Sequence, residues 1–144
     1  MTSAFFQTWQ FYALASAVFA SLTAIFGKLG VAKISSDLAT LIRTVVVFFV
    51  LLALISYKKE WAWDESITKK SIFFLVLSGI ATGCSWLFYY RALQMGEASR
   101  VAPVDKMSVA LTVILAFFIL GEPFSLKTLL GTFFVLLGTF LLLK

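Results

Sequence analysis

An acidic and a basic residue stand side by side at the start of an apolar run, as Asp105 and Lys106. Only 15 charge-free residues separate Lys106 from Glu122, whereas a helix needs roughly 20 residues to cross the hydrocarbon core of a bilayer. The span must therefore extend back through both charged residues. Ionisable groups within a span are rare and mark paths for substrates or protons. Pro103 adds to this signal, because it removes a main-chain donor and leaves a carbonyl of the preceding turn free to face a ligand or water.

A salt bridge near the membrane interface is the alternative interpretation of this pair. In that arrangement Lys106 extends outward, and Asp105 pairs with Arg43 or Arg100. Arg43 is itself embedded in a span, because only 14 charge-free residues follow it. It can serve as an interfacial anchor, as a partner for Asp105 or as part of a ligand site.

Small and polar side chains form stripes at helical spacing on three of the apolar segments. The third segment carries Ser78, Thr82, Ser85 and Tyr89, the fourth Asp105, Ser108 and Thr112, and the first Ser16, Ala20, Thr23 and Gly27. Such stripes turn away from lipid, so we expect them to line one polar cavity. The alternative is that each hydroxyl bonds to its own helix backbone and that the small residues ease packing.

Three aromatic residues lie late in the third apolar segment, at Trp86, Tyr89 and Tyr90. An aromatic belt at the membrane interface is the ordinary reason for such residues. They can equally form the walls of a site for an apolar or cationic solute. The candidate substrate-binding and coupling residues are therefore Asp105, Lys106, Arg43, Trp86, Tyr89, Tyr90, Ser85 and Ser108.

Several functional classes are unsupported by the sequence. The chain has no histidine, which removes Ser-His-Asp and Cys-His arrangements and the usual metalloprotease site. It has no glycine-rich phosphate-binding loop, and its basic residues are scattered rather than gathered into a stripe for nucleic acid. We therefore expect no enzyme activity, no catalytic residue, no metal, no cofactor and no nucleic-acid partner.

The elements that position these residues are all helices within a membrane. Of the 144 residues, 61% are hydrophobic and only 13% are charged, against about 45–50% and about 25% in an ordinary soluble domain. The sequence predicts an all-α, multi-pass membrane protein in which a single domain, residues 1–144, forms a bundle of five transmembrane helices. We expect these helices at about residues 9–29, 38–57, 71–90, 101–120 and 126–143.

The distribution of positive charge gives the bundle little preference for one orientation. The loops and chain ends on each side of the membrane carry five Lys and Arg residues, and the count becomes five against seven when Arg43 and Lys106 are added to the second side. Orientation follows this bias, so the chain can insert both ways. Two opposed copies would form an inverted repeat of five plus five helices, a known transporter architecture. Gly131 and Gly138 give the last helix a small-residue face for helix packing or for a dimer contact. A fixed orientation is the alternative.

Two segments resemble a known family. Residues 89–103 read YYRALQMGEASRVAP and residues 120–125 read LGEPFS, and a helix containing Gly131 and Gly138 follows. This order resembles the EamA domain of the drug/metabolite transporter superfamily, and in particular its short five-helix members. Most members carry two such domains with inverted topology and move small metabolites or drugs outward, often by proton exchange. The acidic residue that small multidrug members use in the first helix has no counterpart here, which leaves Asp105 as the candidate for coupling.

The resemblance and the residues together predict an exporter of a small organic solute. It would work in the inner cell membrane as an antiparallel homodimer, by alternating access, with protons as the coupling species. An apolar environment favours the neutral form of a carboxylic acid, so an embedded carboxylate can take up a proton on one face and release it on the other. A non-transporting membrane subunit, or a component that carries lipids across the bilayer, is the alternative.

Overall fold

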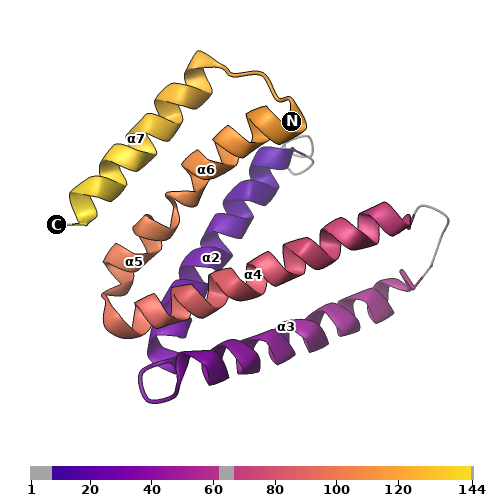
Figure 1. The fold of residues 1–144 in the computed structure, drawn as a ribbon. Coiled ribbons are helices and arrows are strands. Elements are labelled where there is room, and N and C mark those ends of the chain that lie inside the picture. Colours follow the sequence, from indigo (N-terminus) through magenta and orange to yellow (C-terminus); the bar gives the residue numbers. More distant parts are fainter. Residues whose placement is uncertain (1–7, 62–66, 144) are drawn as a thin grey trace, which may run out of the picture. The chain divides into compact units, whose positions relative to one another are not determined.

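The computed structural model describes residues 8–61 and 67–143, and this part of the chain is helical without any strand (Figure 1). Four of its helices are long and apolar enough to cross a membrane: α2 (Trp9–Gly30), α3 (Ser36–Lys58), α4 (Lys69–Met95) and the segment Ala98–Leu120. The last helix, α7 (Leu126–Leu142), has 17 residues, the lower limit for a span. The chain is therefore a helical membrane protein with several spans.

The helix ends follow from local chemistry. Ser35 caps α3 by accepting a hydrogen bond from the amide of Leu38 at 3.3 Å, so the helix begins before the predicted residue 38. At the start of α7, Ser125 accepts in the same way from the amide of Thr128 at 3.0 Å. Each of these serines satisfies an amide that the first turn of a helix leaves without a partner.

The third span continues beyond its predicted end at residue 90. The five residues that follow, Arg-Ala-Leu-Gln-Met, are all good helix formers, and α4 ends at Met95, immediately before Gly96. The additional turn carries Leu93, whose carbonyl accepts a hydrogen bond from Lys28 of α2, and Gln94, whose amide donates to the carbonyl of Val31 in the connection that follows α2.

The predicted fourth helix, residues 101–120, consists of three pieces in the structure. They are α5 (Ala98–Asp105), α6 (Ser108–Leu115) and a π-helical turn, η1 (Ala116–Leu120). Gly121 ends the segment in the left-handed conformation, with φ of 69°, and its amide donates to the carbonyl of Ala116. Glycine suits this position because it lacks the Cβ that opposes positive φ.

The chain divides into two compact units, which are described separately. Residues 27–94 form one unit, in which α3 and α4 run antiparallel and the connection after α2 lies beside the end of α4 (Figure 1). The other unit comprises the chain before residue 27 and the chain after residue 94. There α7 folds back and contacts both α5 and α6.

Candidate functional site

The fourth span breaks at Asp105 and Lys106, within the unit formed by α5, α6 and α7. The amide of Lys106 donates to the carbonyl of Pro103 at 3.0 Å, and the amide of Met107 donates to the carbonyl of Val104 at 3.0 Å. Both bonds join residues three apart, so the chain tightens into a 3₁₀ turn instead of continuing the α-helix. Asp105 is thus the last residue of one half-helix, and α6 begins at Ser108.

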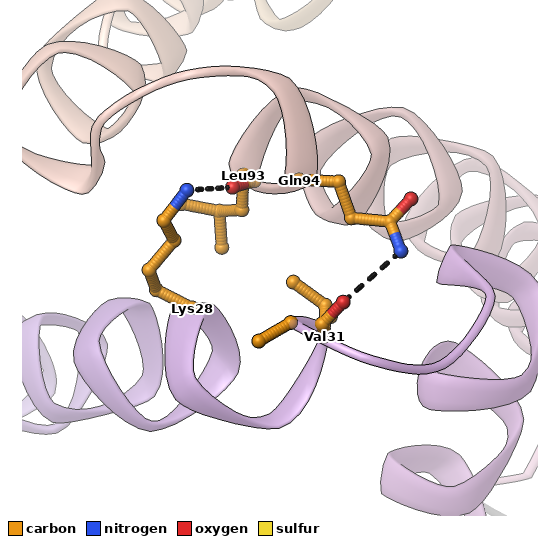
Figure 2. Close-up of a pocket in the computed structure, with 5 residues that line it drawn as sticks. Lys28, Val31, Leu93 and Gln94 are labelled. Atoms are coloured by element: carbon orange, nitrogen blue, oxygen red, sulfur yellow. Dashed lines mark hydrogen bonds between the residues drawn. The ribbon is translucent and has the colours of Figure 1, made fainter.

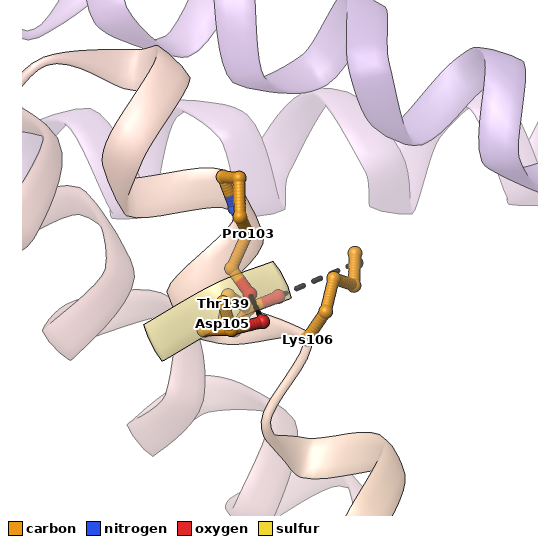
Figure 3. A network of polar contacts seen from close by, with 4 residues as sticks. All are labelled: Pro103, Asp105, Lys106 and Thr139. Carbon is orange, nitrogen blue, oxygen red and sulfur yellow. Dashed lines mark hydrogen bonds and ion pairs between the residues drawn. The ribbon is translucent and has the colours of Figure 1, made fainter. Parts of the chain in front are cut away.

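A side chain of α7 covers this break. The hydroxyl of Thr139 lies 3.2 Å from the carbonyl oxygen of Pro103 (Figure 3). It also lies 2.9 Å from the carbonyl oxygen of Val135, and it shares its single hydrogen between the two. Thr139 is only 3% exposed. Irregular backbone is tolerated in a membrane where protein groups satisfy it, and Thr139 provides such a group. In the sequence only the position of Thr139 in an apolar run after Gly138 indicates this role, and Thr139 was not among the predicted site residues.

The carboxylate of Asp105 pairs with the neighbouring ammonium of Lys106 at 3.4 Å (Figure 3). The side chain of Asp105 is 38% exposed and that of Lys106 is 55% exposed. Arg100, one of the two partners considered for Asp105, instead pairs with Glu97 at 3.4 Å. A half-buried carboxylate beside a broken helix is accessible to a polar solute.

Arg43 of α3 lies against the aromatic residues of α4, in the unit formed by residues 27–94. The central carbon of its guanidinium is 3.6 Å from the centroid of the Trp86 ring and 5.6 Å from that of Tyr90. Both distances are within the range of cation–π attraction. The structure therefore brings together three of the residues that the sequence marked as candidates. Tyr89 is half-buried, and its ring centroid lies 6.4 Å from that of Tyr90.

Tyr90 is held in place by close packing against the end of α2. Tyr90 is 5% exposed and Leu93 is fully buried. A Cβ atom at Gly27 would lie 2.7 Å from Cε1 of Tyr90 and 3.5 Å from Cδ1 of Leu93. Real Cβ atoms essentially never approach another atom as closely as the first of these distances. Gly27 was expected to belong to a small-residue stripe on the first helix, and here its lack of a side chain makes room for the Tyr90 ring.

A pocket of about 370 Å³ lies between the end of α2 and the end of α4, lined by Lys28, Val31, Ala32, Leu93 and Gln94. The ammonium of Lys28 donates to the carbonyl of Leu93 at 2.6 Å, and the amide of Gln94 donates to the carbonyl of Val31 at 3.1 Å (Figure 2). The Gln94 amide also donates to the carbonyl of Ile34 at 2.6 Å. Lys28 and Gln94 satisfy carbonyls at a helix end and in the connection, so they have a structural role, and neither was among the predicted site residues.

The remaining polar candidates lie on the surface of the single chain. Ser85 and Ser108 are exposed, as are Ser78, Thr82 and Thr112. The hydroxyl of Thr82 bonds to the carbonyl of Ser78 at 2.8 Å, which is the backbone-directed alternative considered for these residues. Residues 8–61 and 67–143 contain no group of three or more His, Cys, Asp or Glu side chains placed to hold a metal ion.

The spans, the broken helix and the embedded Arg43 define a multi-pass membrane protein with polar groups inside its apolar segments. The model of the EamA-like transporter family matches residues 7–144, and the chain belongs to this family. The resemblance drawn from the two sequence segments is thereby confirmed. Family membership supports a transporter role.

Two relatives extend this comparison. The chain is 50% identical over 136 residues to a Sinorhizobium protein named "Uncharacterized transporter in cobO 3'region", covering 94% of this chain and 96% of the relative. It is 34% identical over 128 residues to an uncharacterized protein of Methanocaldococcus jannaschii, covering 84% of this chain and 90% of that protein. No solved structure matches the chain.

Proposed function

We propose that the protein exports a small metabolite or drug across the inner cell membrane in exchange for protons, and that it does so by alternating access. The observation that carries this proposal is the break in the fourth span, with Asp105 at its edge. Transporters build their substrate and ion sites from discontinuous helices, because a break presents main-chain and side-chain polar groups inside the membrane. Asp105 would take up and release the coupling proton there.

The working unit would be an antiparallel homodimer. Every residue from 71 to 82 of α4 is exposed on the single chain, including Ser78 and Thr82 of its polar stripe, and Ser85 of the same stripe is also exposed. The hydroxyl of Thr82 bonds to the carbonyl of Ser78 in its own helix, but small and polar residues favour packing against another helix over contact with lipid, and a second copy can provide that helix. A Cβ atom added at Gly131 or Gly138 of α7 would meet no other atom within 4 Å. This small-residue face is therefore also open to a partner helix. Both relatives are close to this chain in length, as expected if one-domain members function in pairs.

Reconstitution tests the transport function directly. A thermal-shift screen of metabolites on the detergent-solubilised chain would first select a solute, because a ligand that binds only the folded state raises the melting temperature. We expect the purified chain alone, in liposomes with a pH gradient, to move that solute against its concentration gradient. A solute that binds without any flux would instead favour a non-transporting subunit or a lipid carrier.

The near balance of positive charge on the two sides predicts that the chain inserts in both orientations. We expect a reporter tag at the carboxyl terminus to be found on both faces of the membrane in comparable amounts. Two extra lysines placed in one loop should move the tags to a single face, because Lys and Arg in short loops set orientation. A carboxyl terminus that occupies one face in every unmodified molecule would exclude the antiparallel dimer.

A further inference from the structure

The geometry at Arg43 points to the chemical class of the solute. We propose that Arg43, stacked on Trp86 and beside Tyr90, binds an oxyanion, namely a carboxylate or phosphate group carried by the solute. This inference rests on the proposed transport function and adds to it the charge of the transported molecule.

Arg43 lies well inside the membrane. The 14 charge-free residues that follow it in α3 cover about 21 Å, and the hydrocarbon core is about 30 Å thick. Lys58 follows Arg43 by 15 residues, a rise of about 22 Å, so Arg43 is roughly 8 Å inside the hydrocarbon when Lys58 marks the opposite surface. A guanidinium at this depth needs partners, because arginine cannot lose its proton in a protein.

The stacking leaves the hydrogen-bond donors of Arg43 available. A distance of 3.6 Å between the guanidinium carbon and the Trp86 centroid is too short for an N–H group to point at the ring, so the two planes face each other. The N–H groups then point outward from the edges of the stack. Within the unit formed by residues 27–94, the described residues supply Arg43 with neither a hydrogen-bond acceptor nor an ion-pair partner.

An oxyanion fits this arrangement better than the other solute classes. The guanidinium presents five donors in a planar fork that matches two oxygens of a carboxylate or phosphate. A cationic solute, which Trp86 and Tyr90 could otherwise attract, would meet an aromatic face already covered by a positive charge. Packing of Tyr90 against Gly27 holds this part of the aromatic support in position.

Tryptophan fluorescence of the full chain in maltoside micelles can report binding at Arg43. The probes are benzoate and inorganic phosphate, with benzylamine as the cationic counterpart. We expect benzoate, phosphate or both to change the emission saturably, with a dissociation constant on the order of 1 mM, and benzylamine to have no effect. Trp86→Phe identifies the share of the signal that comes from this ring among the four tryptophans.

Variants at Arg43, compared with a variant at Arg91, distinguish a specific oxyanion site from a general effect of positive charge. Arg43→Gln should abolish the response, and Arg43→Lys should weaken binding about tenfold, because lysine cannot form the planar two-point contact. Arg91→Gln, which removes the same charge from an exposed position on α4, should respond as the unmodified chain does. If both Arg43 variants fold, by thermal unfolding, and retain the full response, the inference is overturned.

Lipid bilayers distinguish the possible sources of the anion. A response to benzoate or phosphate in micelles supports a solute. A response that depends on Arg43 but arises only with phosphatidylglycerol bilayers, and not with phosphatidylcholine alone, overturns the assignment to the solute and points to a lipid headgroup. Loss of anion binding with flux intact rejects this inference alone, whereas anion binding without flux rejects the transport function alone.

Discussion

We expect Asp105→Asn to reduce proton-driven flux of the solute to the level of liposomes without protein. Asparagine has nearly the same size as aspartate and keeps an oxygen that can face Lys106, but it cannot bind and release a proton in the working range of pH. The variant should therefore fold normally and still bind the solute. Flux under a pH gradient and solute binding by thermal shift are the two measurements needed.

Glu97→Gln is the matched control for this experiment. Glu97 lies at the start of α5, pairs with Arg100 and has a side chain that is 73% exposed, against 38% for Asp105. An exposed pair of this kind contributes little, so the control should transport at close to the unmodified rate. Undiminished proton-driven flux in Asp105→Asn would rule out Asp105 as the coupling residue. An equal loss of flux in both variants would show that the effect is not specific to Asp105.

The second large effect is expected at Gly27. Leucine at this position would place its first side-chain carbon 2.7 Å from the ring of Tyr90, and that ring is only 5% exposed and cannot move aside freely. We expect Gly27→Leu to destabilise the folded chain by about 1–3 kcal/mol through overpacking. Because the guanidinium of Arg43 also lies near the Tyr90 ring, Gly27→Leu should weaken anion binding as well.

Gly30→Leu provides the comparison. Gly30 is the last residue of the same helix, and an added Cβ there meets nothing within 4 Å. Neither glycine has positive φ, so the backbone accepts a side chain at both positions, and a lower melting temperature for Gly27→Leu than for Gly30→Leu in detergent reports the contact with Tyr90. Equal melting temperatures would contradict the close packing at Gly27.

Family membership and the membrane class could be predicted from the sequence, whereas the local form of the fourth span could not. The length of each apolar run is a local property, so it indicates a span without knowledge of its neighbours. Pro103 indicated a free carbonyl near the start of the span, but it lies inside α5, and the break at Asp105 and Lys106 was not predicted. The break itself also depends on Thr139, which lies far along the chain and covers the carbonyl of Pro103.

For the candidate site residues, the residue types could be predicted from the sequence but their contacts could not. Arg43 and Trp86 were each selected by type, the first as an embedded charge and the second as a late aromatic residue. Periodicity along one helix cannot show which side chain of another helix it meets, so their stacking could not be predicted. Lys28 and Gln94 were missed because their partners are main-chain carbonyls, and every residue has such a carbonyl whatever its type.

The sequence alone determined that the chain is helical, lies in a membrane and belongs to the EamA-like family, because hydrophobic run length and short motifs are local features. Only the tertiary structure decided that Arg43 faces an aromatic ring, that Tyr90 fills the space left by Gly27 and that Thr139 covers the break beside Asp105. Each of these contacts joins segments far apart in the chain. Such contacts form when helices pack closely, and their geometry depends on both surfaces at once.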